Sequence, residues 1–288
     1  MKQGLSLFLK GILMGICDLI PGISGGTIAF ITGIYSRLIN AVKGFSPKLI
    51  IDLLKGDKKS FLEDIKKLDL GFLIILATGI FTSIFLGSRL VIFLLENYFV
   101  YTVSFFIGLI LASSKSIYDK IETHHTKNRL FGLVGFIIGI LFALIIPVNI
   151  APNLLYVFFG GFLAISAMFL PGISGAFILL ILGLYEFMLN VLHDLLNNIS
   201  VFIVFILGAL LGMFSISRII SFLFKKDRCK TLYVLLGLVI GALSIPVRNV
   251  LLNGKWNILN IITAFLFLLL GLISAGSLDK LNEKKNKP

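Results

Sequence analysis

The sequence predicts an all-α integral membrane protein built as an inverted repeat, in which each half holds one re-entrant helical hairpin and three transmembrane helices. Composition carries the first part of this prediction. Of the 288 residues, 58% are hydrophobic and 14% are charged, whereas about a quarter of a soluble domain is charged. Gly11–Asn40 and Gly161–Asn190 align without a gap and share 12 identities in 30 positions. We therefore assign residues 1–150 to a first repeat and residues 151–288 to a second.

The aligned stretch opens each half and is interrupted at its centre by a turn signal. The sequence PGISG at residues 21–25 recurs at residues 171–175. Proline and glycine break helices, and paired breaks at matching positions of two halves indicate a substrate site at the repeat interface. We expect residues 4–42 and 154–192 each to form a re-entrant hairpin of two short helices. The alternative is two full crossings per element, for which arms of about 16 residues are short.

A lysine-rich segment, residues 43–68, follows the first hairpin and alternates apolar and charged residues. This pattern predicts an amphipathic helix at the cytoplasmic membrane surface, and a solvated loop is the alternative.

Six apolar segments complete the two halves. Each has 17–25 residues, which matches a hydrocarbon core of about 30 Å at 1.5 Å per residue. They are residues 71–95, 99–115 and 130–147 in the first half and residues 200–224, 231–247 and 258–277 in the second. A second internal match supports the repeat, because Ser88–Leu109 aligns with Ser217–Leu238, including Thr102 with Thr231.

Loop charges set the expected orientation. The basic segments are Lys43–Lys67, Lys115–Arg129, Lys225–Lys230 and Lys280–Pro288, and the charge-poor ones are Glu96–Val100, Pro147–Asn153 and His193–Ser200. Val247–Trp256 is the weakest case. The positive-inside rule then places both termini in the cytoplasm and inverts the second half relative to the first. The net charge of +12 lies in these short loops, so we expect contact with anionic phospholipids rather than nucleic acid.

The two tips are the candidate binding site. Backbone N–H groups of Gly25, Gly26 and Gly175 can approach a ligand closely, and Ser24, Thr27 and Ser174 add hydroxyl groups. A helix that begins at such a turn presents a positive partial charge, so the arrangement suits a phosphate or a carboxylate. The alternative is a tight turn that only permits close packing.

Four charged residues in or near apolar segments are further candidates. Arg89 and Arg218 occupy matching positions, where they can bind a phosphate with two parallel hydrogen bonds or extend to the membrane surface. Asp18 precedes the first tip, and its counterpart is Met168. Asp18 is interpreted either as an ion-coupling group or as a counter-ion to an arginine. Glu186 is a second possible coupling group, unless it faces the lipid head groups.

The sequence indicates no catalytic, metal or cofactor site. Cys17 and Cys229 lie in unrelated contexts without a CxxC spacing, and the three histidines, His124, His125 and His193, lie in loops. The chain also lacks the GxxxxGK[ST] motif for ATP. We therefore expect a protein that is not an enzyme.

The motif DxxPGxSGGT at Asp18–Thr27, the second motif PGxSGA at Pro171–Ala176 and the basic loops resemble the PopT-type undecaprenyl-phosphate translocases. These are polytopic bacterial membrane proteins, and the resemblance covers nearly the whole chain. It implies location in the bacterial plasma membrane and a polyprenyl phosphate partner. It also implies that the spent carrier lipid phosphate is flipped from the outer to the inner leaflet for reuse in cell-wall precursor synthesis.

The repeat and hairpins are also similar to bacterial undecaprenyl-pyrophosphate phosphatases, which carry a PGxSRS-type motif. Gly25 and Gly26 stand where the phosphatase has Arg and Ser, and only Asp18 remains of its acidic motif. This comparison favours a phosphate-binding scaffold without hydrolytic residues. Two alternatives stay open, a secondary transporter of a small anion and a lipid-pyrophosphate phosphatase. The sequence leaves the oligomeric state open.

Overall fold

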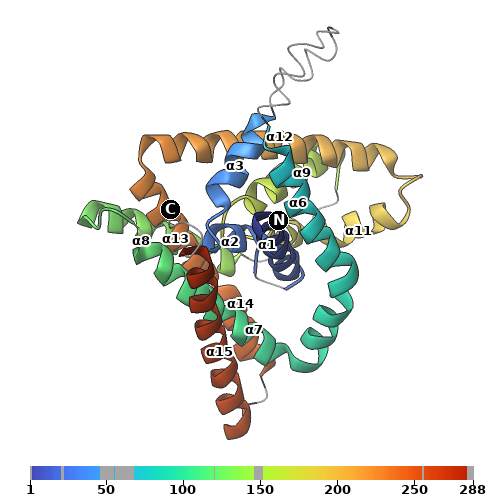
Figure 1. Ribbon diagram of the computed structural model, residues 1–288. Coiled ribbons are helices and arrows are strands. Elements are labelled where there is room, and N and C mark those ends of the chain that lie inside the picture. Colours follow the sequence, from blue (N-terminus) through green and yellow to red (C-terminus); the bar gives the residue numbers. More distant parts are fainter. Residues whose placement is uncertain are drawn as a thin grey trace.

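The computed structural model describes residues 2–20, 23–45, 55, 68–119, 121–145, 152–254 and 256–283, and within these ranges every regular element is a helix (Figure 1). Most of the predicted amphipathic segment 43–68 lies outside the described residues. The helices of the first half are α1 (Lys2–Asp18), α2 (Gly25–Ile31), α3 (Tyr35–Gly44), α6 (Leu70–Thr82), the π-helical turn η1 (Ser83–Gly87), α7 (Ser88–Asp119) and α8 (Thr126–Leu144). Those of the second half are α9 (Leu154–Met168), α10 (Gly175–Ile181), α11 (Tyr185–His193), α12 (Ile199–Lys226), α13 (Arg228–Ala242), α14 (Ser244–Asn253) and α15 (Ile258–Glu283).

Four of the six apolar segments predicted as spans lie wholly on helices, 130–147 is helical as far as Leu144, and 231–247 crosses the break between α13 and α14. The loop predicted at Val247–Trp256 is wrong over much of its length, because α14 continues to Asn253. The first segment comprises α6, η1 and the first turns of α7, and α7 bends at Tyr98, inside the predicted loop Glu96–Val100. By length and composition, four described helical segments can cross a membrane, and counting the bent pair α10–α11 as one span raises this to five. Large apolar side chains such as Leu133, Leu207 and Phe265 are at least half exposed on α8, α12 and α15. Such surfaces are stable in lipid rather than in water, so the chain is a multi-pass membrane protein.

The prediction of two helices per hairpin is wrong, because each second arm is broken again. Gly33 separates α2 from α3, and Gly183 separates α10 from α11. Both glycines have positive φ, 75° and 65°, a conformation that strongly favours glycine. The helices α10 and α11 are bent by 108° relative to each other. Each repeated element is therefore a group of three helices, and the two glycines that cause this stand at matching positions of the alignment.

The first helix of each group packs in parallel on the next long helix, α1 on α6 and α9 on α12. Glycines bring the backbones together. A Cβ atom on Gly79 would collide with the carbonyl oxygen of Phe8, and one on Gly208 would collide with that of Phe158. These two contacts join the same aligned positions in the two halves. Small residues at helix contacts are the usual means of close packing in membranes.

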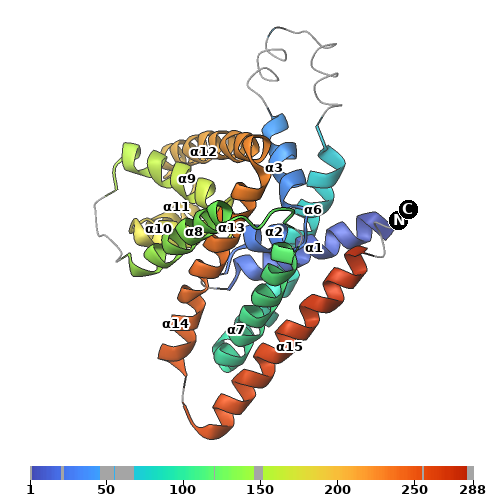
Figure 2. The same cartoon turned by 90° about the vertical axis from the view of Figure 1, so that its left-hand side faces the viewer.

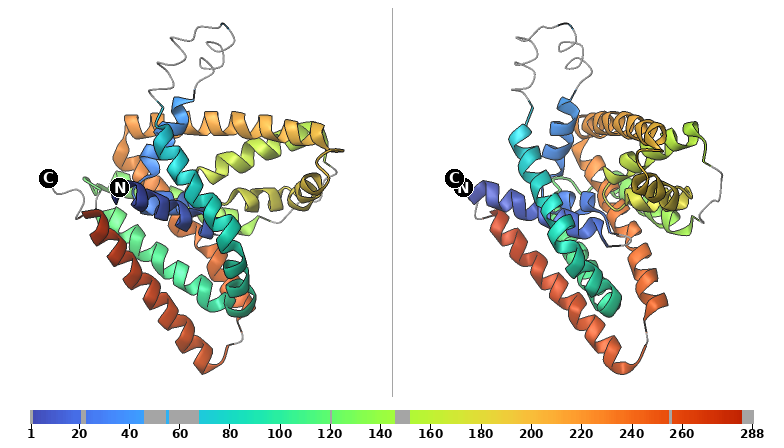
Figure 3. Two further views of the ribbon diagram at one scale, coloured as in Figure 1. Left: turned by 45° about the vertical axis from the view of Figure 1, so that its right-hand side comes forward. Right: turned by 90° about the vertical axis from the view of Figure 1, so that its right-hand side faces the viewer.

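The last helix of each half packs on the other half. In the first pair, α15 lies parallel to α7 (Figure 2), and Gly271 meets the carbonyl oxygen of Phe105. In the second pair, α8 lies parallel to α13, and Gly135 meets the carbonyl oxygen of Val234. Phe105 and Val234 occupy aligned positions, so the two contacts are equivalent. Thus α8, the last helix before residue 150, packs on a helix that follows this residue, and α15 packs on one that precedes it. The start of α1 and the end of α15 lie on the same side of the molecule (Figure 3).

Candidate functional site

The two tips meet at the centre of the molecule. The N–H of Gly172 donates a hydrogen bond to Thr27 Oγ1 over 2.7 Å, and the Tyr35 hydroxyl donates one to the carbonyl oxygen of Phe169, also over 2.7 Å. A Cβ atom on Gly26 would lie only 2.6 Å from the carbonyl oxygen of Met168. Residues 134–145 positions apart therefore share one packed contact. Pro21 and Gly22 lie outside the described residues, so the contact is built from the flanks of the first turn.

The polar groups of the first tip already have partners. Ser24 is fully buried and caps α2, because its Oγ accepts the N–H of Gly26 at 3.2 Å. The N–H of Gly25 donates to Asp18 Oδ1 over 2.7 Å. The Thr27 hydroxyl accepts from the second tip. The carboxyl group of Asp18 therefore engages a backbone N–H at the start of α2.

The second tip is more open. Ser174 precedes α10, yet its side chain makes no capping hydrogen bond, and both Ser174 and Gly175 are only half-buried. Gly172 has a φ of 93° and lies close to the backbone of α13, with its Cβ position 3.0 Å from the Leu238 carbonyl oxygen. The position that matches Asp18 is Met168, which is 37% exposed. Thus the same PGISG turn leaves its hydroxyl uncommitted in the second half.

A cavity of about 260 Å³ lies between the first tip and the second tip. The first half contributes Asp18, Leu19 and Ile20 to its wall, and the second half contributes Ser174, Ala176, Phe177, Leu180 and Tyr185. Its polar side chains are one carboxyl group and two hydroxyl groups. Hydroxyl groups can donate to a phosphate oxygen, whereas an ionised Asp18 would repel it. Among the described residues that line the cavity, none is a cation.

The two arginines do not join the tips. Arg89 is exposed at the start of α7. Arg218 folds onto its own helix, where Nη1 donates to the Phe214 carbonyl oxygen at 2.9 Å and the guanidinium lies 5.7 Å from the Phe214 ring. Glu186 is exposed in the first turn of α11. The structure therefore brings the predicted tip residues together and leaves Arg89, Arg218 and Glu186 elsewhere.

Sequence reasoning missed two residues that hold the first tip. Lys10 Nζ donates to the carbonyl oxygen of Thr32 over 2.7 Å, and Thr32 ends α2. A cation at a helix C-terminus is favourable. The signal was present in the sequence, because Lys10 is a single lysine in an apolar arm and its aligned position is Gly160. Tyr35 is the other missed residue, and it is one of the 12 identities of the repeat.

Comparisons with known proteins identify relatives of this chain. Residues 14–256 match the model of a family described as VCA0040-like, undecaprenyl phosphate translocase-like. A polyprenyl-phosphate transporter of Vibrio cholerae serotype O1 is 39% identical over 240 residues, which are 83% of this chain and 76% of that protein. A polyprenyl-phosphate transporter of Staphylococcus aureus is 28% identical over 265 residues, which are 82% of this chain and 83% of that protein. No solved structure matches the chain.

Proposed function

Because this chain belongs to the undecaprenyl phosphate translocase-like family, we propose that it carries a polyprenyl phosphate from the outer to the inner leaflet of the bacterial plasma membrane. The lipid would then be reused in cell-wall precursor synthesis. Two relatives named polyprenyl-phosphate transporters support the substrate class. The observation that carries the site is the contact between the tips, with a cavity between them that exposes Ser174. A site at the interface of two repeats is typical of transporters.

The phosphate would bind between the tips and compete with Asp18. In this structure the Asp18 carboxyl group holds the N–H of Gly25. Two like charges about 4 Å apart near a protein surface repel by about 4 kcal/mol. Phosphate entry therefore requires Asp18 to take up a proton or to turn away from α2. We propose that this exchange couples phosphate movement to a proton, with Asp18 as the coupling group. Glu186, which is exposed, has no such contact to support a coupling role.

The two arginines would neutralise the phosphate in another conformation. The cavity lining described above offers no cation, so the structure fits a state in which the site is closed to the charged head group. Arg218 is held by a carbonyl oxygen of its own helix, a bond that a phosphate can replace. We expect Arg218→Ala and Arg89→Ala each to weaken lipid-phosphate binding by about 1.5–3 kcal/mol, and lysine to restore part of it. Unchanged binding in both alanine variants would assign the arginines to the membrane surface.

The packing directions support the inverted topology. With the orientation that the loop charges give, α1 and α6 both run outward, and α7 and α15 both run inward. All four close helix pairs are parallel, as this assignment requires. Both termini would then be cytoplasmic. Cysteines at Lys127 and Asn197 test the proposal in a variant without native cysteines, since Lys127 should react only from inside and Asn197 only from outside. The reverse pattern would overturn it.

The decisive test of function is uptake in proteoliposomes. Purified protein should move externally added polyprenyl phosphate to the inner leaflet without releasing inorganic phosphate from a lipid pyrophosphate. Uptake of free inorganic phosphate at a similar rate would instead identify a transporter of a small anion. Hydrolysis of the lipid pyrophosphate would identify a phosphatase. Ser174→Ala should lower uptake, while Asn190→Ala, an exposed position on α11 away from the cavity wall, serves as the control.

A further inference from the structure

A second cavity lies beside α12 and α13, outside the site between the tips. Its volume is about 420 Å³, within the range of about 300–1,000 Å³ for ligand pockets. Leu170, directly before the second tip, marks one end, and Lys226, Asp227 and Lys230 mark the other. The remaining lining residues are Phe131, Ile216, Ile219, Ile220, Leu223, Thr231, Val234, Leu235 and Leu238. The cavity thus joins the second tip to the basic turn between the two helices.

We propose that this groove binds the isoprenoid chain of a polyprenyl monophosphate in the cytoplasmic leaflet, with its phosphate at Lys226 and Lys230. The inference rests on the proposed function and deepens it, because it gives the lipid tail a place on the exit side. Along α12, Ile216 and Asp227 are 11 residues apart, which corresponds to about 16 Å. Ile219 and Leu223 are about half exposed, so a chain can enter from the surrounding lipid without crossing the protein.

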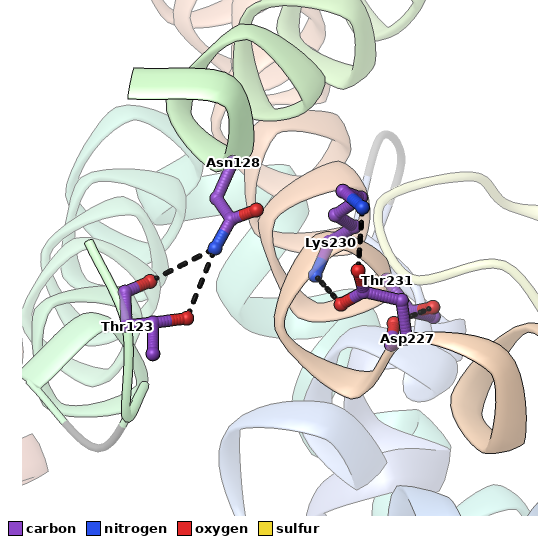
Figure 4. A network of polar contacts seen from close by, with 5 residues as sticks. All are labelled: Thr123, Asn128, Asp227, Lys230 and Thr231. Carbon is purple, nitrogen blue, oxygen red and sulfur yellow. Dashed lines mark hydrogen bonds and ion pairs between the residues drawn. The ribbon is translucent and has the colours of Figure 1, made fainter. Parts of the chain in front are cut away.

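The basic end of the groove is held in a fixed geometry. Lys230 Nζ pairs with Asp227 Oδ2 at 2.6 Å and lies 5.7 Å from the Phe131 ring. Asp227 also accepts the N–H of Lys230 at 2.9 Å and so caps α13 (Figure 4). Because Asp227 offsets Lys230, the net charge at the mouth comes from Lys226. Its ammonium lies 6.0 Å from the Phe222 ring, and no acidic side chain pairs with it among the described residues.

The aligned positions of the first half carry uncharged residues in place of Lys226 and Lys230. Asn97 and Tyr101 align with Lys226 and Lys230. Tyr101 stacks on Phe267 at 5.6 Å and hydrogen-bonds to Asn260 Oδ1 at 2.8 Å. Lys230 therefore packs on the Phe131 ring of α8 in the same way that Tyr101 packs on the Phe267 ring of α15. The two halves thus share this packing on an aromatic ring, but only the second half carries lysines there. The anion site is therefore present on one face of the membrane only. The loop charges assign that face to the cytoplasm.

The groove fits a lipid with one chain and a compact anionic head. Apolar walls beside a lipid-facing surface suit a hydrocarbon chain, and a lysine at head-group depth suits a phosphate. Most of the lining residues are apolar and the charged ones lie at one end, which matches one hydrocarbon chain that carries one anionic head. A free phosphate ion would leave the apolar walls unused. The chemistry of both ends therefore selects a polyprenyl monophosphate.

Photolabelling of the full-length protein in phosphatidylcholine proteoliposomes tests the proposal. The probe is a short-chain polyprenyl monophosphate with a diazirine in its chain, and the labelled peptides are identified by mass spectrometry. We expect label on α12 and α13 between residues 216 and 238. Leu223→Trp, which fills the groove, should lower this label at least fivefold. Leu94→Trp, at the aligned position of the first half, should leave it unchanged.

Charge variants keep the test independent of the groove-filling variant. Lys226→Gln should lower labelling about fivefold, the factor for one lysine at an anionic head group. Lys225→Gln changes an exposed neighbour that does not line the groove and should have a clearly smaller effect. Equal effects of the two variants would reduce the role of Lys226 to general surface charge and overturn the assignment of the phosphate. Excess unlabelled polyprenyl phosphate should abolish the label.

Two results would overturn the groove itself. One is label spread evenly over the lipid-facing helices, and the other is equal competition by phosphatidic acid, which would indicate a groove for any anionic lipid. An uptake assay on the same vesicles separates this inference from the proposed function. Uptake with label elsewhere would leave translocation standing and remove the groove. Label in the groove without uptake would leave the groove standing and remove translocation.

Discussion

The two halves of this protein contain the same five-residue turn but use it differently. In the first half, Asp18 and Ser24 accept the N–H groups of Gly25 and Gly26, and the tip is closed. In the second half, Ser174 makes no capping bond and faces a cavity. In both copies a helix ends three residues before the motif and the next begins at its last glycine, and the neighbouring side chains decide whether the polar groups remain available. One copy of the motif thus has its polar groups engaged by neighbouring side chains, and the other leaves its serine hydroxyl facing a cavity.

The largest expected difference concerns the residue after each turn. Gly26 is buried with its Cβ position 2.6 Å from the Met168 carbonyl oxygen, whereas the aligned residue Ala176 already carries a Cβ and is exposed. Gly26→Val should destabilise the fold by about 3 kcal/mol, since backbone atoms must move to admit the side chain. Ala176→Val should change stability by less than about 0.5 kcal/mol. Thermal unfolding in detergent measures both, and equal shifts would contradict the division between the tips.

The next largest effect concerns Asp18. Asp18→Ala leaves the N–H of Gly25 without its acceptor in a buried place, which should cost about 1–3 kcal/mol. Asp18→Asn keeps an acceptor oxygen and should cost less than half as much. It should also make uptake of polyprenyl phosphate independent of pH, because the coupling group no longer exchanges a proton. Met168→Ala is the matched control in the second half. If uptake by the asparagine variant follows the wild-type pH profile, Asp18 is a capping residue only.

The serines give a smaller and more selective contrast. Ser24→Ala removes a helix cap and should lower stability by about 1 kcal/mol. Ser174→Ala removes no such bond, so its stability should match the wild type while its uptake falls. Unfolding midpoints and uptake rates, normalised to inserted protein, separate the two roles. A loss of stability in both variants with equal uptake would mean that both tips are packing turns.

The sequence was sufficient for most of the long apolar helices and for the helix ends next to the PGISG turns, because hydrophobic runs and these turns are local signals. It was insufficient for Gly33 and Gly183, since glycine in an apolar run is compatible with either a continuous or a broken helix. The sequence also did not predict that α8 packs on α13 and α15 on α7. This packing depends on contacts of Gly135 and Gly271 that form only between the folded halves.

The candidate site also has features that the sequence did not predict. The matching positions of Arg89 and Arg218 suggested either contact with a phosphate or extension to the membrane surface, and in the structure Arg218 bonds to its own helix. Equivalent positions in a repeat share backbone environment, and they need not share side-chain partners. The engagement of Gly25 by Asp18 likewise depends on how the chain turns between α1 and α2, which neither periodicity nor composition specifies.

The smallest effect concerns an ion pair that exists only in the first half. Arg37 binds Asp69 through two hydrogen bonds, Nε to Oδ2 at 2.6 Å and Nη2 to Oδ1 at 3.0 Å, and so joins α3 to α6. The aligned residues of the second half are Phe187 and Asn198. The hydrogen bond from Arg37 holds the pKa of Asp69 below its usual value. A carboxyl group whose pKa is lower in the folded state stabilises the fold above about pH 4, its unfolded value.

This stabilisation is lost as the pH falls through the folded pKa of Asp69, because the protonated acid no longer pairs with Arg37. Both side chains are partly exposed, 58% and 38%, so the pair is worth less than about 1 kcal/mol. Asp69→Asn should therefore lower the unfolding midpoint slightly at pH 7 and leave it unchanged near pH 2. Glu186→Gln, at an exposed acid of α11, should change neither. An equal fall of the unfolding midpoint at both pH values would show that Asp69 acts through packing. The charge pair would then contribute nothing to the stability of the first half.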